Sequence, residues 1–358
     1  MYPLAMLMIG LGIAITTSGE PVFPGSTWQH RTPEEVGMSA EGLKAFSDCI
    51  GGLGCVTRHG YMVYSWGDPT ARRNVASACK PFYCHFLFRA VEDGKLGGVD
   101  DYVGEFEPRL DGLNPDLGYK DRNIRWRDLA NQVSCYGVTE APGTAFDYND
   151  FNMALFFDTL FLKVYGVTWE TVDDQVLHPM LTDPIGCQDD PTFMSSGTDR
   201  RQGRVGISCR DFCRVGLLYL RGGRWEDRQL IRAEDVRMAV STPVPNAIPR
   251  TQGQEAEMIP GQRSIGGGRN QGEHLGSYSF AWWINGVTPD GRRQWWDAPA
   301  DTFAASGNCG KRFMVVMPSL GIVASWNDGD INEETERTKE NEALGLLARA
   351  VTNGAPDR

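Results

Sequence analysis

Ser77 and Lys80 lie three residues apart in the stretch Asn-Val-Ala-Ser-Ala-Cys-Lys-Pro-Phe, residues 74–82. Three residues are just under one helical turn, so both side chains would point to the same side of a helix. We expect Ser77 at the helix start, where backbone N–H groups without intrahelical partners favour developing negative charge. A lysine held close to the serine and partly desolvated could accept its proton, because burial lowers the pKa of an ammonium group. The pattern therefore indicates nucleophilic catalysis, although a helix-capping serine followed by a solvated lysine fits the same residues.

The composition is that of an ordinary globular protein. Of 358 residues, 41% are hydrophobic and 23% are charged, which suffices for a sizeable core without disulfides or metals. The net charge of −11 argues against nucleic acid or an anionic membrane as a partner. We therefore predict no nucleic-acid partner.

The N-terminus carries an apolar run at residues 4–16, followed by small residues at 17–19. The run is too short to span a bilayer comfortably and has the length of a signal-peptide core, although no Lys or Arg precedes it. We interpret residues 1–20 as a signal peptide or anchor and predict an exported protein, periplasmic or extracellular, with no further membrane span. A buried N-terminal element is the alternative.

Cysteines and histidines show no metal-ligand spacing. The nine cysteines are an odd number, so at least one thiol is free or pairs with another chain. No Cys-x-x-Cys pair occurs, and the five histidines are scattered. We predict no metal and no cofactor.

Periodicity and capping signals place strands at both ends of the chain and helices in the middle. The expected helices cover a segment from residue 39, then 77–92, short pieces within 95–200, 208–221 and 333–352; the expected strands cover two within 55–66, then 278–284, 302–306, 312–317 and 321–326. Residues 241–276 are polar and indicate a surface loop. The two strand groups would share one antiparallel sheet, which gives an α+β fold. We expect a single domain at 21–358, with a sheet lobe at about 21–76 and 210–358, a helical lobe at about 77–209, and Ser77 on the floor of a cleft between them.

Six segments along the chain, including the Ser77–Lys80 stretch, occur in the order in which one protein superfamily has its motifs. They are Ser77-Ala-Cys-Lys80, then 92–103, 124–130, 141–150, 208–225 and 303–310. Together they resemble the serine β-lactamase and penicillin-binding-protein superfamily, in particular its class C-like branch of carboxylesterases, D-aminopeptidases and 6-aminohexanoate-dimer hydrolases. The resemblance covers roughly residues 30–350 and implies an antiparallel sheet flanked by helices, plus an all-helical lobe.

The resemblance also implies roles for individual residues. Ser77 would be the nucleophile that forms an acyl-enzyme, and Lys80 would activate it. Tyr148 falls on the tyrosine of the family's Tyr-x-Asn motif and would take the serine proton and return it to the leaving group. The backbone N–H groups of Ser77 and of Asn308, which follows Ser306–Gly307, would form the oxyanion hole.

Asp150 is the first departure from the family pattern, because it stands where Tyr-x-Asn has asparagine. An ionised carboxylate cannot donate a hydrogen bond to a substrate amide. It could instead pair with Lys80 and hold it charged, which would move the base role to Tyr148. The alternative is that Asp150 only caps the helix that begins there.

Ala305 is the second departure, because the family's third motif usually begins with a cation that binds a substrate carboxylate. Lys311 or Arg312 could supply that charge from nearby. Without it, we expect weak or absent β-lactamase and D,D-peptidase activity and favour hydrolysis of a neutral ester or amide. The tryptophans Trp282, Trp283, Trp295 and Trp296 would either line the cleft or belong to the core.

The sequence thus predicts a serine hydrolase of the carboxylesterase or amidase type, acting on a small-molecule ester or amide. One alternative is a catalytically idle binding protein on the same scaffold, and another is a true β-lactamase or D,D-peptidase. An α/β-hydrolase is disfavoured, because no Gly-x-Ser-x-Gly motif occurs.

Overall fold

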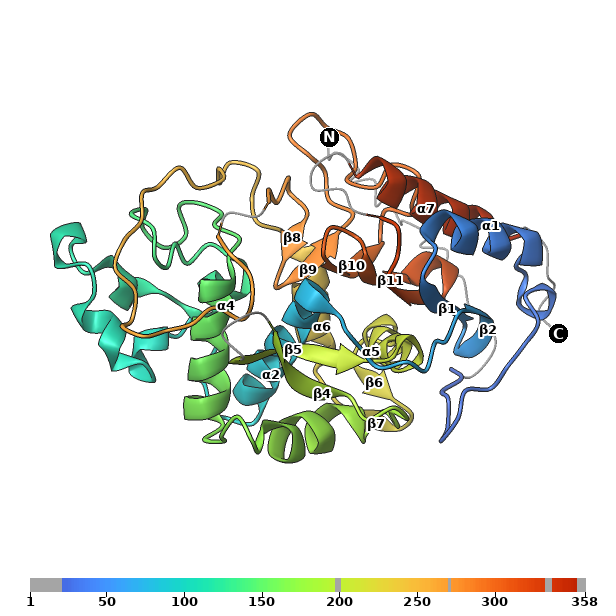
Figure 1. The fold of residues 1–358 in the computed structure, drawn as a ribbon, viewed down its shortest axis with the longest axis horizontal. Coiled ribbons are helices and arrows are strands. Elements are labelled where there is room, and N and C mark those ends of the chain that lie inside the picture. The colour runs from blue at the N-terminus through green and yellow to red at the C-terminus, as the bar shows by residue number, and fades with distance from the viewer. Residues whose placement is uncertain (1–20, 197–200, 270–271, 332–336, 353–358) are drawn as a thin grey trace, which may run out of the picture.

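The structure, a computed structural model, describes residues 21–196, 201–269, 272–331 and 337–352 (Figure 1). The helices are α1 (Ala40–Ile50), α2 (Lys80–Glu92), α3 (Trp126–Ala130), α4 (Asp150–Phe157), α5 (Cys209–Leu220), α6 (Ala233–Ser241) and α7 (Thr338–Arg349). The strands are β1 (Leu53–Arg58), β2 (Tyr61–Trp66), β3 (Arg73–Asn74), β4 (Thr192–Ser196), β5 (Arg201–Ile207), β6 (Arg224–Trp225), β7 (Arg228–Gln229), β8 (Tyr278–Ser279), β9 (Trp282–Ile284), β10 (Phe303–Gly307), β11 (Arg312–Met317) and β12 (Ile322–Asn327).

The main sheet has seven antiparallel strands in the order β2-β1-β12-β11-β10-β9-β8. Strand β1 pairs with β12, with Val56 opposite Ala324, so the first and last strand groups of the chain share one sheet. This confirms the α+β fold class. It also means that the two ends of the sequence must meet before the sheet can form.

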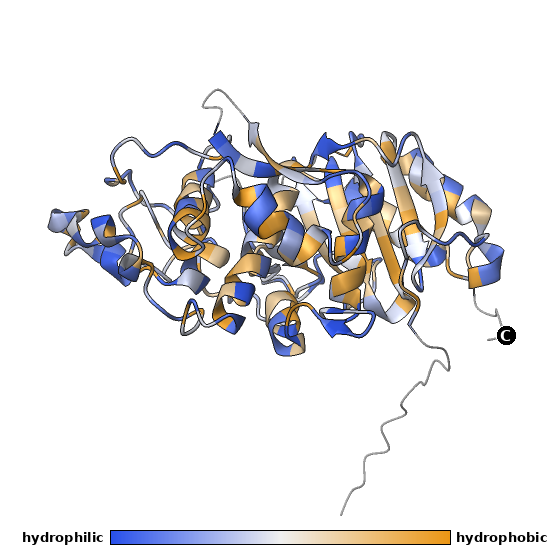
Figure 2. Ribbon diagram, turned by 90° about the horizontal axis from the view of Figure 1, so that it is seen from below, coloured by the Kyte–Doolittle hydropathy of each residue, from blue (hydrophilic) through white to orange (hydrophobic). Residues whose placement is uncertain are grey.

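Helices lie on both faces of this sheet (Figures 1 and 2). Side chains of β11 and β12 alternate between the faces, so each face has its own packing partners. On one face Phe313 stacks on Trp326 at 4.5 Å between ring centroids, and Phe46 of α1 packs edge-on against Trp326. On the other face α5 approaches so closely that a side chain at Gly216 would overlap Val323. These contacts bury the centre of the sheet and make it a rigid platform.

The caps of two helices form as the sequence predicts. Ser39 accepts a hydrogen bond from the backbone N–H of Gly42 at 3.1 Å, and α1 begins at the next residue. Ser208 accepts from the N–H of Asp211 at 3.2 Å and starts α5 in the same way. Both satisfy a backbone donor that a helix start would otherwise leave unpaired.

A second, three-stranded sheet lies in a region where the sequence analysis expected only helices and loops. Its order is β3-β5-β4, and β5 is buried although it carries two arginines, Arg201 and Arg204. These charged residues hide the strand from a search for alternating apolar side chains.

The predicted strand at 278–284 is two strands. Phe280 and Ala281 both have left-handed backbone conformations, with φ of 43° and 68°, and the chain reverses there. As a result β8 pairs antiparallel with β9 instead of continuing into it. Neither residue is a glycine, so no local turn signal marks the reversal.

The predicted surface loop at 241–276 also differs from expectation. It begins only after the end of α6, and its residues Ile259 and Ile265 are buried. The carbonyl of Gly268 accepts a hydrogen bond from the backbone N–H of Asp150 at 3.0 Å, so this segment holds the start of α4. Part of the loop is therefore core and not surface.

Other sequence predictions concern the N-terminus and the cysteines. Residues 1–20 lie outside the described part of the chain, so the signal peptide and export stay predictions. Within the described ranges, no helix has the length and apolar character needed to cross a bilayer. All nine cysteines lie in the described ranges, and none of them forms a disulfide there.

His85 on α2 gives a testable pH dependence of stability. The ring is fully buried, and burial lowers its pKa to about 3 from an ordinary 6.5. The unfolded chain therefore binds a proton below pH 6.5 that the folded chain does not. We expect this residue to lower the free energy of unfolding by about 1.4 kcal/mol per pH unit as the pH falls from 6.5 towards 3.

The measurement is urea denaturation of the wild type and His85→Gln between pH 6.5 and 5. Substitution should remove this part of the slope, while the carboxyls of Asp128 and Asp147, whose pKa values burial raises to about 6, contribute equally to both proteins. Parallel stability curves for the two proteins would contradict the prediction.

Candidate active site

Ser77 lies on a tight turn and not inside a regular α-helix. Residues Ala76–Cys79 form a 3₁₀ turn, and α2 begins at Lys80. Ala76 has a left-handed conformation with φ of 51°, and its N–H donates to the Asn74 side-chain oxygen at 2.7 Å. This conformation costs a non-glycine residue about 1 kcal/mol or more, and it presents the half-buried hydroxyl of Ser77 at the end of the helix.

Lys80 meets Ser77 within hydrogen-bonding distance. Its Nζ donates to Ser77 Oγ at 2.8 Å and to the Asp150 carboxylate at 2.9 Å. The lysine is almost entirely buried, so it is not a solvated surface residue. Burial alone would lower the pKa of Lys80, but the nearby Asp150 carboxylate and Tyr148 phenol hold it above its ordinary value.

Asp150 is the first residue of α4, and its side chain turns to the site. The helix is capped by its neighbour Asn149, whose side chain accepts from the N–H of Asn152 at 2.6 Å. The capping alternative for Asp150 is therefore wrong. Burial would raise the pKa of its carboxyl, but the charges of Lys80 and Arg204 lower it below the usual range.

Arg204 of β5 is a site residue that the sequence analysis missed. Its Nη2 donates to the Asp150 carboxylate, and its Nη1 lies 3.4 Å from Ser77 Oγ. The guanidinium is buried, yet the pKa of Arg204 is raised, because the attraction of Asp150 exceeds the effect of burial. Arg204 reaches Ser77 because it lies on strand β5, which was not predicted from the sequence. None of the sequence motifs includes this residue.

Tyr148 also reaches the lysine. Lys80 Nζ lies 4.4 Å from the centroid of the Tyr148 ring, at cation–π distance. The ring packs against Tyr278 and Trp283 at centroid distances of 5.8 and 6.2 Å. The structure therefore brings Ser77, Lys80 and Tyr148 together from two parts of the chain.

Strand β10 comes close to the backbone of Ser77. A Cβ on Gly307 would overlap the carbonyl oxygen of Val75 and lie 3.1 Å from the Ser77 nitrogen and 3.0 Å from that of Ala78. Only glycine permits this approach. It places the Gly307–Asn308 end of the strand beside the Ser77 amide, as an oxyanion hole built from both segments requires.

The other predicted residues around β10 divide between core and surface. Ser306 is half-buried on β10 and Ala305 is fully buried, so position 305 supplies no cation. Arg312 lies directly opposite Gly307 on β11, and burial lowers its pKa, whereas Lys311 is exposed.

The four tryptophans have different surroundings. Trp282 and Trp295 belong to the core, and Trp296 is exposed. Trp283 lies near Tyr148, and the buried guanidinium of Arg337 covers its ring at 4.1 Å from the centroid. The chain thus places a cation near Tyr148 that the sequence motifs did not indicate.

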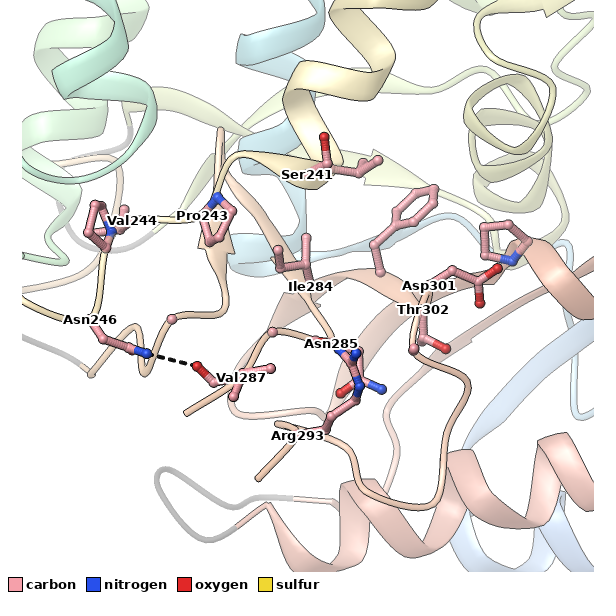
Figure 3. A pocket seen from close by; sticks show the side chains of 17 residues that line it. Ser241, Pro243, Val244, Asn246, Ile284, Asn285, Val287, Arg293, Asp301 and Thr302 are labelled. Atoms are coloured by element: carbon pink, nitrogen blue, oxygen red, sulfur yellow. Dashed lines mark hydrogen bonds between the residues drawn. The ribbon is translucent and has the colours of Figure 1, made fainter. Parts of the chain in front are cut away.

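Three cavities in the described part of the protein lie away from these residues. The largest of the three, about 600 Å³, is lined by apolar side chains such as Val244, Ile284 and Phe303 (Figure 3). In it the polar Asn246 already donates to the Val287 carbonyl at 2.8 Å. None of the three is lined by Ser77, so the expected cleft above Ser77 is not among them.

Within the described ranges, no group of histidine, cysteine and acidic side chains could hold a metal ion.

The fold is that of serine β-lactamases and penicillin-binding-protein homologues. Solved structures of these classes match nearly the whole chain at low sequence identity. This confirms the fold predicted from the resemblance. No family model and no curated relative matches the sequence.

Three of these structures show the extent of the match. A β-lactamase from Mycobacterium bovis aligns with a TM-score of 0.55 at 13% identity, covering 87% of this chain and 99% of the other. EstCE1, described as a hydrolase with promiscuous acyltransferase activity, aligns at 0.57 and 13%, covering 89% and 99%. A penicillin-binding-protein homologue from Caulobacter crescentus aligns at 0.53 and 13%, covering 88% and 99%.

The close approach of β10 leads to a prediction for Gly307→Ala. The added methyl group would push the strand away from the Ser77 amide and separate the two backbone donors. Because loss of one oxyanion donor typically costs a factor of about 100 to 1,000 in rate, we expect modification of Ser77 by a fluorophosphonate to slow by about 100-fold.

Gly112→Ala is the matched control, because nothing lies within 4 Å of a Cβ at that position. Circular dichroism would verify that both variants fold. An unchanged modification rate in folded Gly307→Ala would show that this approach does not set the site's reactivity.

Proposed function

We propose that this protein is a serine hydrolase that forms an acyl-enzyme at Ser77 with a small-molecule ester or amide. The observation that carries the proposal is the 2.8 Å hydrogen bond from the buried Lys80 ammonium to Ser77 Oγ, beside the ring of Tyr148. The fold supports it, because the matching structures include β-lactamases and a hydrolase. The alternative, a solvated lysine next to a helix-capping serine, does not fit, because Lys80 is buried and donates to both Ser77 and Asp150.

In the proposed mechanism Tyr148 is the base, because the raised pKa of Lys80 keeps its ammonium charged near neutral pH. The ammonium donates to Ser77 Oγ and lies 4.4 Å from the centroid of the Tyr148 ring. Tyr148 then takes the hydroxyl proton while Oγ attacks the substrate carbonyl.

The remaining steps follow from the same groups. The negative oxygen of the tetrahedral intermediate accepts hydrogen bonds from the amides of Ser77 and Asn308. When the intermediate collapses, the bond to the leaving group breaks and Tyr148 returns the proton to it, which leaves an ester on Ser77. A water molecule, deprotonated by Tyr148, then attacks this ester. The bond from the acyl carbon to Ser77 Oγ breaks, Tyr148 returns the proton to Oγ, and the acid leaves.

For the substrate we propose an ester or amide of the carboxylesterase or amidase type. The buried Ala305 offers no side chain to bind a substrate carboxylate, which argues against β-lactams and D-Ala-D-Ala peptides. If rapid β-lactam hydrolysis were found, Arg337 or Arg312 would be the cation to examine.

The test is covalent labelling combined with turnover. We expect a fluorophosphonate to add once, at Ser77, and p-nitrophenyl esters to be hydrolysed, because the hydrogen-bonded hydroxyl is activated. Intact-mass and peptide mass spectrometry would locate the adduct. Ser77→Ala should lose both properties, and Ser319→Ala, a serine whose partner is Asp301, should keep them.

A catalytically idle binding protein is the competing function. Folded wild-type protein that forms no adduct and turns over no ester or amide in a broad screen would favour it and contradict the hydrolase.

Tyr148→Phe tests the proton shuttle separately from the nucleophile. The variant keeps the ring that packs on Tyr278 and Trp283 but loses the hydroxyl, so folding should be unaffected. We expect kcat for a p-nitrophenyl ester to fall by a factor of about 100 to 10,000, the usual contribution of a general acid–base. Full activity would remove Tyr148 from the mechanism.

A further inference from the structure

Asp150 and Arg204 form a pair that is buried beside the nucleophile. Both side chains are almost fully inaccessible to solvent, and the carboxylate lies between two cations, with one oxygen on Lys80 Nζ and the other on the Arg204 guanidinium. Arg204 also points Nη1 at Ser77 Oγ, 3.4 Å away. The serine hydroxyl therefore faces two cationic donors from two different elements.

The charge of this cluster explains why the two residues occur together. An aspartate alone would neutralise Lys80 and strengthen its hold on its proton. A second buried cation on the opposite carboxylate oxygen offsets that effect, so that the whole cluster carries one net positive charge when Lys80 is an ammonium. Asp150 without Arg204, or Arg204 without Asp150, would leave the site with a different charge.

We infer that Arg204 is a positioning residue of the reaction, which holds the Asp150 carboxylate and the Ser77 hydroxyl and acts with Asp150 as one unit. This inference rests on the proposed function of Ser77. In this view Asp150 of α4 and Arg204 of β5 together take the place of the neutral asparagine that the Tyr-x-Asn motif has at position 150.

Other titratable or charged groups face the cluster as well. They are Tyr148 before α4, Cys79 on the 3₁₀ turn, Tyr83 on α2, Tyr278 on β8, Arg312 on β11 and Arg337 before α7. All of them stay in place in the variants below, so the shifts between variants report the changed charge.

The experiment is the pH profile of kcat/KM for a p-nitrophenyl ester. Its acid limb reports the proton that the site must lose before it can take the proton of Ser77. Arg204→Gln removes a positive charge, which favours proton retention, and should move the limb to higher pH. Asp150→Asn removes a negative charge and should move it to lower pH. We expect a shift of about one pH unit in each direction.

Two further variants separate charge from packing. The double variant Asp150→Asn/Arg204→Gln loses both charges, so its limb should return close to that of the wild type. Arg204→Lys keeps the positive charge, so the acid limb of its profile should lie at the pH of the wild type. This should hold even where the loss of the bidentate guanidinium lowers kcat.

Arg201→Gln is the matched control. Arg201 is a buried arginine of the same strand, but its guanidinium pairs with Asp158 and touches none of the reacting groups. The acid limb of the pH profile of Arg201→Gln should lie at the same pH as that of the wild type. Circular dichroism and fluorophosphonate labelling at Ser77 would show that each variant is folded and can react.

The outcomes separate the two proposals. If the wild type neither labels at Ser77 nor hydrolyses esters, the proposed function fails. If the wild type is active but the two single variants shift the limb in the same direction, or leave it in place, the inference about Arg204 is overturned. Opposite shifts that cancel in the double variant support it.

Discussion

The buried carboxylate of Asp150 is the contact on which the arrangement of the site depends. It joins α4 to Lys80 at the start of α2 and to Arg204 on β5, so three elements meet at two oxygens. Removing one partner from a buried ion pair typically costs about 3–5 kcal/mol, because the remaining charge is left without compensation. The cluster therefore fixes the geometry around Ser77 and does not rely on the flexible lysine chain alone. The backbone of Asp150, held by the carbonyl of Gly268, adds a fourth segment.

The sheet supplies the other half of the site. Strand β10 reaches the Ser77 turn because Gly307 has no side chain, and the neighbouring strands hold β10 in register. The turn itself is constrained by the left-handed Ala76 and its link to Asn74. A rigid strand facing a constrained turn holds backbone donors in place without any reorganisation during a reaction, which is the condition for strong electrostatic stabilisation.

The elements that the sequence predicted are those with local signals. The capping residues Ser39 and Ser208 predicted the starts of their helices. The alternation of apolar residues in β1, β2, β11 and β12 predicted the strands of the sheet. The meeting of Ser77, Lys80 and Tyr148 was predicted through the family resemblance and not from periodicity. What stayed hidden was set by tertiary contacts. Strand β5 is buried despite its arginines because each of them has a carboxylate partner, Asp158 or Asp150, more than 40 residues away in the chain. No local pattern contains that information.

The parts that surround Ser77 are also far apart along the polypeptide. Lys80 is three residues from the serine, whereas Gly307 is separated from it by most of the chain. The N-terminal part of the chain joins the sheet that contains β10 through the long-range pairing of β1 with β12, which β11 connects to β10. Contacts of such long range form late, because loop closure must precede them. A partly synthesised or partly folded chain would hold the serine and the lysine but not yet the strand that faces them. The complete cluster of side chains and strand would therefore exist only once the sheet has closed through the pairing of β1 with β12.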